Sequence, residues 1–164
     1  MSMLKMWFTL LTMQRNEMST RRQARCITLE ILFEIDIVGH TPAEVMDRRL
    51  GEEEMDKAGL DFALRLMEGV LKYQDIMDLL IARYAPEWPL DQMAVIDRNV
   101  LRIAIYEFLI DDETPVKVAI NEAVELAKEY GSDSAPRFIN GVLGTLAEQI
   151  PQLRQEIVAA SEPT

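Results

Sequence analysis

The stretch from 94 to 110, AVIDRNVLRIAIYEFLI, constrains the fold most, because it is apolar around most of its helical circumference. Its few polar residues recur three or four positions apart, so on an α-helix they form one narrow stripe. These residues are Asp97, Arg98, Asn99, Arg102, Tyr106 and Glu107. Such a helix is predicted to lie inside a helical bundle, with Asp97, Arg98 and Arg102 on the face that reaches solvent or a partner. A membrane span needs about 20 nearly uninterrupted apolar residues, so this shorter, charged stretch is not one.

Length and charge limit the remaining choices. The chain has 164 residues, 49% of them hydrophobic, so one compact domain with a sizeable core is expected. A formal net charge of -11 argues against non-specific nucleic-acid binding by the molecule as a whole. The charge is uneven, because residues 1–38 hold five basic and four acidic side chains, or +1, which leaves -12 for the remainder.

The chemistry of catalysis and metal binding is missing from the sequence. One cysteine, Cys26, and one histidine, His40, cannot supply a disulfide within the chain or a conventional metal cluster. The sequence also has no GxSxG, P-loop, GxGxxG, HExxH or CxxC motif. We therefore expect neither an enzyme nor a metal or cofactor site, and we expect a reducing, cytoplasmic compartment.

Residues 1–18 are interpreted as a loosely ordered N-terminal extension. They contain Lys5 and the apolar run MWFTLLTM, which has the composition of a signal peptide but is followed by no small-x-small cleavage site. A start upstream of a more natural one at Met18 is the preferred interpretation. The helical domain is predicted over 19–150, and 151–164 is predicted to be a terminal helical turn with a frayed acidic tail.

The segment from Ser19 to Gly39 is predicted to be a helix with Ser19 or Thr20 as its N-cap and Gly39 as its stop. One apolar stripe runs through Ala24, Ile27, Thr28, Ile31, Ile35 and Val38, and a second runs through Cys26, Leu29, Phe33 and Ile37 on the opposite side. A helix sandwiched inside its own bundle would use both stripes. The alternative is an exposed docking stripe for a partner protein.

Three arginines, Arg21, Arg22 and Arg25, stand at the start of this helix. Cations there oppose the helix dipole and cost a little stability, so another interaction must favour them. A solvated charged end and a phosphate-binding cluster are both consistent with the pattern.

Further helices are predicted from apolar spacing and caps. They cover 42–50 after the capping box TPAE, 60–73, 76–84, a segment opened by Thr114 as N-cap and ended by Gly131, and a last core helix capped by Ser134. Trp88, between Pro86 and Pro89, is expected to be wedged into the core. Gly141 and Gly144 suggest the close approach of another backbone.

Arg137 and Phe138 lie off the apolar face of the last core helix, close to Tyr130 at the end of the preceding one. An exposed aromatic ring beside an arginine has the composition of a base-stacking site. Packing at the edge of the core would explain the same pair.

Four ordered blocks, RRQAR, DRNVLRIAIYE, TPVKVAINEAVELAKEYG and RFINGVLG, resemble the NusB family of bacterial transcription antitermination factors over about 19–150. The resemblance implies an all-α fold of about seven helices in two small bundles. It implies binding of boxA-type single-stranded RNA in nascent ribosomal RNA transcripts, pairing with the ribosomal protein NusE, and a place in the RNA polymerase antitermination complex, with no membrane association.

Carried onto matching positions, the resemblance implies two sets of site residues. The RNA-binding set is Arg21, Arg22, Arg25, Arg102, Tyr130, Arg137 and Phe138. The protein-partner set is Phe33 and Asp97, and Leu29 is added to it because it shares the second apolar stripe with Phe33. The sequence departs from the family pattern at Gln23, which interrupts the arginine run, and in its large acidic surplus. An alternative is a NusB-like protein-interaction or ribosomal RNA-binding module without an antitermination role.

Overall fold

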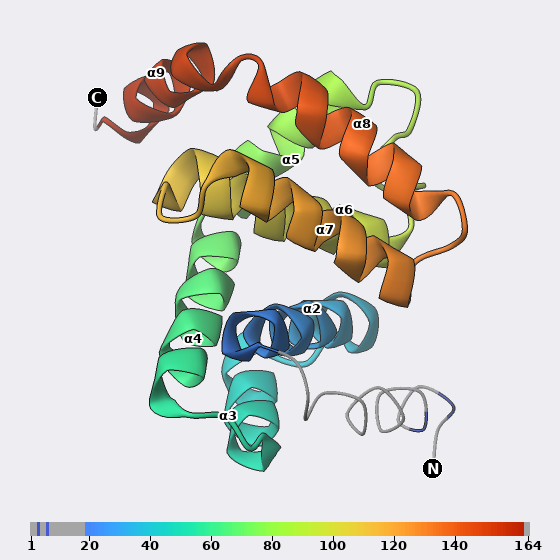
Figure 1. Ribbon diagram of the computed structural model, residues 1–164, viewed down its shortest axis with the longest axis vertical. Coiled ribbons are helices and arrows are strands. Elements are labelled where there is room, and N and C mark those ends of the chain that lie inside the picture. The colour runs from blue at the N-terminus through green and yellow to red at the C-terminus, as the bar shows by residue number, and fades with distance from the viewer. Residues whose placement is uncertain (1–2, 4–5, 7–18, 163–164) are drawn as a thin grey trace. The chain divides into compact units, whose positions relative to one another are not determined.

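The computed structural model describes residues 3, 6 and 19–162, so the predicted extension over 1–18 lies almost wholly outside the described residues. The described part of the chain forms eight α-helices and one π-helical segment and contains no strand, which confirms the all-α prediction (Figure 1). The chain divides into two compact units, with the boundary between Met67 and Glu68.

The first unit begins with α2 (Thr20–Val38), whose two ends follow the predicted caps. The Ser19 hydroxyl accepts a hydrogen bond from the Arg22 backbone N–H at 3.3 Å, which satisfies one of the free donors of the first turn. At the other end Gly39 adopts a φ of 73°, a left-handed conformation that favours glycine, and its N–H donates to the Ile35 carbonyl at 3.2 Å.

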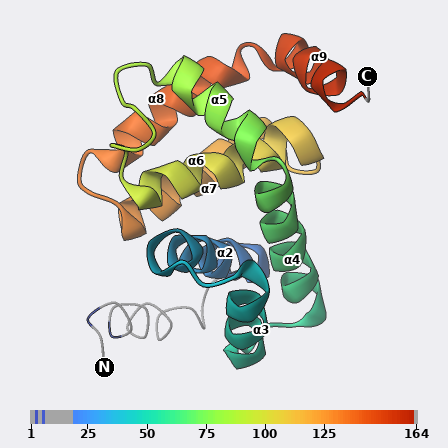
Figure 2. The same cartoon turned by 180° about the vertical axis from the view of Figure 1, so that it is seen from behind.

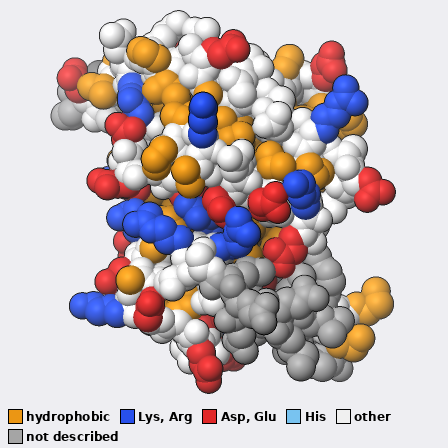
Figure 3. Space-filling model, viewed as in Figure 1, with side chains coloured by type: hydrophobic (Ala, Val, Ile, Leu, Met, Phe, Trp, Pro, Cys, Tyr) orange, Lys and Arg blue, Asp and Glu red, His pale blue; other side chains and the backbone are white. Residues whose placement is uncertain are grey.

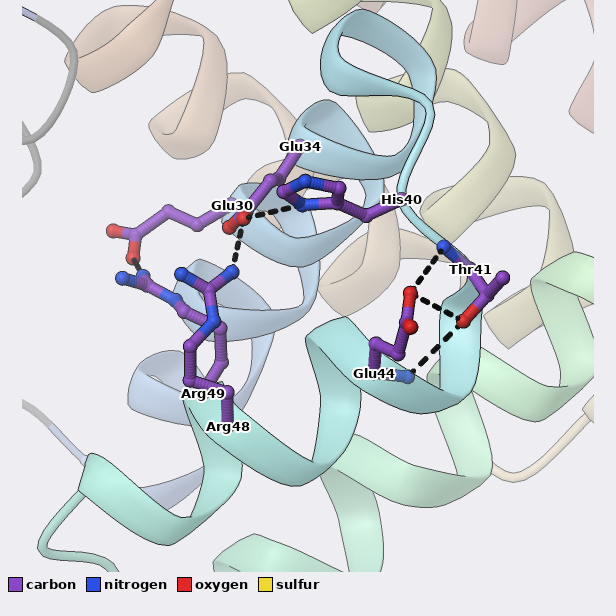
Figure 4. A network of polar contacts seen from close by, with 7 residues as sticks. All are labelled: Glu30, Glu34, His40, Thr41, Glu44, Arg48 and Arg49. Carbon is purple, nitrogen blue, oxygen red and sulfur yellow. Dashed lines mark hydrogen bonds and ion pairs between the residues drawn. The ribbon is translucent and has the colours of Figure 1, made fainter.

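Helix α3 (Pro42–Glu52) is joined to α2 by ion pairs (Figure 4). Arg49 pairs with Glu30, a fully buried carboxylate that needs a cation, and Arg48 pairs with Glu34.

The predicted capping box starts α3. The Thr41 N–H donates to the Glu44 carboxylate at 3.2 Å, and the Glu44 N–H donates to the Thr41 hydroxyl at 3.4 Å. Hydrogen bonds from the side chain and backbone of Thr41 lower the pKa of Glu44. The cap therefore holds the carboxylate in its charged form.

Helix α4 (Lys57–Lys72) begins in the first unit and ends in the second. In the first unit, a Cβ on Gly59 would lie 2.6 Å from Thr20 Cγ2, so only glycine allows α4 to pass this close to α2. In the second unit, a Cβ on Gly69 would lie 2.0 Å from the ring of Tyr106, which in turn stacks on Tyr73 with ring centroids 6.4 Å apart. Two glycines therefore fix the packing of this helix.

The second unit is built from the remaining helices. They are α5 (Gln74–Tyr84), α6 (Val95–Ile105), the π-helical segment η2 (Tyr106–Asp111), α7 (Val116–Tyr130), α8 (Ala135–Ala147) and α9 (Ile150–Ser161). Helices α6, α7 and α8 pack against one another in pairs, α5 packs on α6 and α8, and α9 packs on η2 (Figure 2). Every residue of α6 from Asn99 to Ile105 is buried, as expected for a helix inside a bundle.

The predicted central helix is confirmed, but its last turn widens into η2. A π-turn leaves backbone carbonyls poorly paired, and Arg154 of α9 supplies donors to two of them. Its guanidinium donates to the Phe108 carbonyl at 2.9 Å and to the Leu109 carbonyl at 3.3 Å. The prediction of a single helical turn after 150 is wrong, because α9 runs for 12 residues and anchors itself through this arginine and the buried Leu153.

Two further local predictions are wrong. Thr114 does not cap α7, since Pro115 occupies the N-cap position and the Thr114 hydroxyl donates to the buried carboxylate of Glu107 at 3.0 Å. Gly141 and Gly144 do not mark a close approach, because a Cβ at either position would meet no atom within 4 Å.

Candidate nucleic-acid interface

The arginines at the start of α2 differ in exposure. Arg21 is exposed, Arg22 is partly exposed, and Arg25 is only 3% exposed. The first two can reach a ligand in solution. Arg25 is part of the packed interior, so its guanidinium is not accessible in the way that those of Arg21 and Arg22 are.

The ring of Phe62 on α4 organises this cluster. The guanidinium carbons of Arg21 and Arg25 lie 4.7 and 5.1 Å from the ring centroid, within the range of cation–π attraction. Arg65, one turn after Phe62 on α4, brings a third guanidinium to 5.3 Å. We call these four residues the arginine cluster. Sequence reasoning missed Phe62 and Arg65, because nothing in the pattern of α4 shows which helix it faces.

Arg102 does not belong to an exposed face. It is 4% exposed, and its guanidinium makes a bidentate ion pair with Asp78 of α5 at 2.7 and 2.8 Å. It also donates to the side-chain oxygen of Asn99 at 3.1 Å. The predicted solvent-facing position of Arg102 is therefore wrong, because Asp78 of α5 lies against its guanidinium.

Tyr130, the last residue of α7, is 6% exposed. A ring that is covered to this extent offers no open face for a base. Tyr130 belongs to the buried face of α7 together with Ala123 and Ala127, and not to an exposed surface.

Arg137 and Phe138 lie in the first turn of α8. Arg137 is exposed and Phe138 is partly exposed, as expected for residues off the apolar face. Phe138 meets Trp88 edge-on, with ring centroids 6.4 Å apart and an angle of 70° between the planes. Trp88 is 55% exposed, so the prediction that it is wedged into the core is wrong. We call Trp88, Arg137 and Phe138 the aromatic corner.

The two stripes of α2 are buried over the first half of the helix and open toward its end. Leu29 is fully buried, Phe33 is partly exposed and Ile37 is 53% exposed. The two alternatives predicted from the sequence therefore apply to different parts of α2. Its first half is packed on both sides, and its end has an exposed apolar stripe. Leu29 is excluded as a direct contact of a partner, whereas Phe33 remains reachable.

Asp97, in the first turn of α6, is half-buried, and its Oδ1 has no hydrogen-bond donor among the described residues. Burial raises the pKa of its carboxyl group. Gly131 lies close by, since a Cβ there would be 3.3 Å from Asp97 Oδ1. A carboxylate in this state has a free acceptor for a donor supplied by another molecule.

Other kinds of site are not supported by the described residues. Within 19–162 no group of three or more His, Cys, Asp and Glu side chains could hold a metal ion, and Cys26 is buried. No helix in that range is long and apolar enough to cross a membrane. On the face drawn in Figure 3, several basic side chains lie together although acidic side chains surround them, so the acidic surplus does not exclude a local positive patch.

Comparison with known proteins gives the relatives of this chain. The model of the NusB family matches residues 22–148. The transcription antitermination protein NusB of Roseiflexus sp. (strain RS-1) is 48% identical over 139 residues, which is 84% of this chain and 98% of that protein. The protein of the same name from Salinispora tropica is 47% identical and covers 80% of this chain and 97% of its own length.

Solved structures share the fold. NusB of T. maritima has a TM-score of 0.74 and 34% sequence identity, and the match covers 83% of this chain and 96% of that one. A NusB chain crystallised with NusE and double-stranded RNA has a TM-score of 0.72 at 23% identity, which supports the fold alone. The relatives are named for transcription antitermination and not for a reaction, which agrees with the expectation that the chain is not an enzyme. Because the family model matches most of its length and its relatives share nearly half of their residues with it, this chain belongs to the NusB family.

Proposed function

We propose that this protein is an RNA-binding transcription antitermination factor of the cytoplasm. It recognises boxA-type single-stranded RNA in nascent ribosomal RNA transcripts and pairs with the ribosomal protein NusE within the RNA polymerase antitermination complex. Membership of the NusB family supports the antitermination role. A NusB chain of the same fold has been crystallised with NusE and double-stranded RNA, which supports the choice of partners.

The arginine cluster is the observation that carries RNA binding. Three guanidinium groups lie 4.7, 5.1 and 5.3 Å from the centroid of one ring, so an anion that binds there meets more than one positive charge. A phosphate backbone supplies anions at regular spacing, and neutralising them releases counterions. Arg21 and Arg22 make the direct phosphate contacts in this proposal, because they are accessible. Arg25 supports them from inside the fold.

The second RNA-binding region is the aromatic corner, where Arg137 and Phe138 are reachable. Phe138 is proposed to form part of the aromatic surface that meets a base, and Arg137 to supply a cation for the neighbouring phosphate. Arg102 and Tyr130 are left out of the proposed contacts, because both are buried. Arg102 instead stabilises α5 and α6 through its ion pair with Asp78.

The proposed contacts with NusE are Phe33 and Asp97. Phe33 lies where α2 becomes exposed, so an apolar partner surface can cover it. Asp97 has an acceptor without a donor among the described residues, so a basic partner side chain can pair with it. Charge complementarity of this kind mainly sets orientation and association rate.

The test is a titration of labelled boxA RNA with the protein alone and with an equimolar NusE. We expect weak binding alone, because of the acidic surplus, and a cooperative gain with NusE. A scrambled RNA of the same length is the matched control and should show no such gain. Absence of RNA binding in both titrations would contradict the proposal.

Binding of NusE without any RNA binding would support a protein-interaction module instead. Unchanged RNA affinity after replacement of Arg21 and Arg22 by alanine would support it as well. Equal affinity for boxA and other ribosomal RNA sequences would support an RNA-binding module without an antitermination role. These outcomes separate the proposed function from the alternative that the sequence left open.

A further inference from the structure

Trp88 is a large apolar side chain that the fold leaves 55% exposed. It lies between Pro86 and Pro89 in the segment that joins α5 to α6. Tryptophan has more apolar surface to bury than other residues, so exposure of its ring forgoes a substantial stabilisation. An exposed ring of this kind is an indication of binding, provided that the fold holds it in place.

The segment around Trp88 is held by several hydrogen bonds. The Trp88 N–H donates to the Ala85 carbonyl at 3.1 Å, and the Met93 N–H donates to the Pro89 carbonyl at 2.9 Å. Arg98 of α6 donates from Nη1 to the Leu90 carbonyl at 3.1 Å. These contacts and the two prolines preorganise the segment, so a ligand that covers Trp88 need not order it.

The residues around Trp88 indicate which kind of ligand the exposed ring can bind. Phe138 meets the indole ring edge-on, which braces the ring while more than half of its surface stays exposed. Arg137, the residue before Phe138, is exposed. Glu87 and Asp91 are exposed on the same segment as Trp88, and their charges disfavour a phosphate lying along it. The segment itself is therefore suited to the uncharged, aromatic part of a nucleotide.

We propose that Trp88 is the stacking surface for an unpaired base of the bound RNA, with Phe138 as the ring that braces it. The inference rests on the proposed function and adds a contact that lies outside the residues predicted from the sequence. Stacking on an aromatic ring accepts any base, because every base has a π-face. Trp88 is expected to strengthen binding of single strands and to contribute little to the choice of sequence.

The first test compares the Trp88→Ala and Trp88→Phe variants with the unmodified protein, using boxA RNA of about 12 nucleotides. Trp88→Ala should weaken binding by roughly 5- to 100-fold, the range for loss of one stacked base, whereas Trp88→Phe should stay within a few fold because it keeps a ring. An abasic strand with the same number of phosphates should bind both variants and the unmodified protein equally. Thermal unfolding of each variant shows whether the fold is intact.

The second test uses fluorescence. The sequence has two tryptophans, so the Trp7→Phe variant leaves Trp88 as the sole indole. Saturable quenching by boxA RNA, absent with the abasic strand, is the expected result, since a stacked base quenches the indole directly.

Three outcomes would overturn the inference. If Trp88→Ala is folded and binds RNA with unchanged affinity while Arg21→Ala/Arg22→Ala binds weakly, Trp88 is not a stacking residue and the proposed function stands. If Trp88→Ala loses NusE and keeps RNA, the exposed ring is a protein contact. If the unmodified protein binds no RNA at all, the proposed function fails together with the inference.

Discussion

Helices α2 and α6 carry most of the charged residues singled out from the sequence, yet these side chains differ in exposure between the two helices. On α2 the reachable residues are at the ends: Arg21 and Arg22 near the start, and Phe33 toward the finish. On α6 the polar stripe is buried from Asn99 onward, and Arg102 forms an ion pair with Asp78. In these two helices, neighbouring elements bury the polar side chains in the middle, whereas residues near the ends remain accessible to partners.

The largest expected effect concerns the open end of α2. Phe33→Asp should abolish NusE association, because it places a charge where an apolar contact is proposed. RNA binding by the isolated protein should stay within a few fold. Calorimetric titration with NusE measures the loss of NusE association, and the boxA titration measures the RNA affinity.

Leu79→Asp is the matched control for this substitution. Leu79 is 70% exposed on α5, so the same change of chemistry there should leave NusE binding intact. Unfolding of the Phe33→Asp protein would mean that Phe33 is internal packing and that the comparison between the two helices is wrong at this position.

The second effect concerns the closed stripe of α6. Arg102→Ala should lower the free energy of unfolding by about 3 kcal/mol, because it leaves the Asp78 carboxylate without its cation. This value is at the low end of the stability loss expected when a buried ion pair is broken, because Asp78 is 25% exposed. Urea unfolding gives the value, and RNA affinity per folded molecule should not change.

Arg83→Ala provides the comparison, since Arg83 pairs with Glu156 at 2.9 Å on an exposed surface. That variant should lose less than about 1 kcal/mol. Equal stability of the Arg83 and Arg102 variants, with weaker RNA binding only in the latter, would show that Arg102 is a surface contact after all.

The smallest effect concerns Asp97. Burial raises the pKa of this carboxyl group in the folded protein, so the associated stability is present below the ordinary pKa and is lost as the pH rises through the folded value. Relative to Asp97→Asn, the unmodified protein should therefore gain stability as the pH falls from neutral to acidic. Unfolding free energies of both proteins across this range measure the difference.

A relative stability that falls toward acidic pH would instead indicate that Asp97 is stabilised in its charged form. In that case it would not be the unsatisfied carboxylate that the NusE contact requires.

The sequence predicted the helices well where the signal is local. Ser19 and Gly39 end α2 as expected, and the Thr41 capping box starts α3, because caps depend on residues three or four positions apart. The widened turn of η2 was not predictable, since the donors for its carbonyls come from Arg154, more than 40 residues further along the chain.

The candidate site was predicted in part for the same reason. The identity of Arg21, Arg137 and Phe138 as off-core residues follows from helical periodicity, and the structure leaves them at least partly exposed. The burial of Arg102 depends on Asp78, which is 24 residues away, and the arginine cluster depends on Phe62 of another helix. Periodicity shows which residues share a face but not which element covers it.

The accessible arginines at the start of α2 are proposed to bind RNA phosphates. The most direct measurement is the dependence of RNA affinity on salt concentration for Arg21→Ala/Arg22→Ala, with the buried Arg25 left in place to preserve the fold. Each phosphate neutralised on a single strand contributes about 0.7 to the slope of log affinity against log salt, so the slope should fall by about 1.4.

Arg83→Ala/Lys128→Ala is the control, because it removes two positive charges from exposed ion pairs elsewhere. We expect a flattened slope and weaker binding for the α2 variant and a nearly unchanged slope for this control. Equal slopes for the α2 variant and the unmodified protein would contradict the claim.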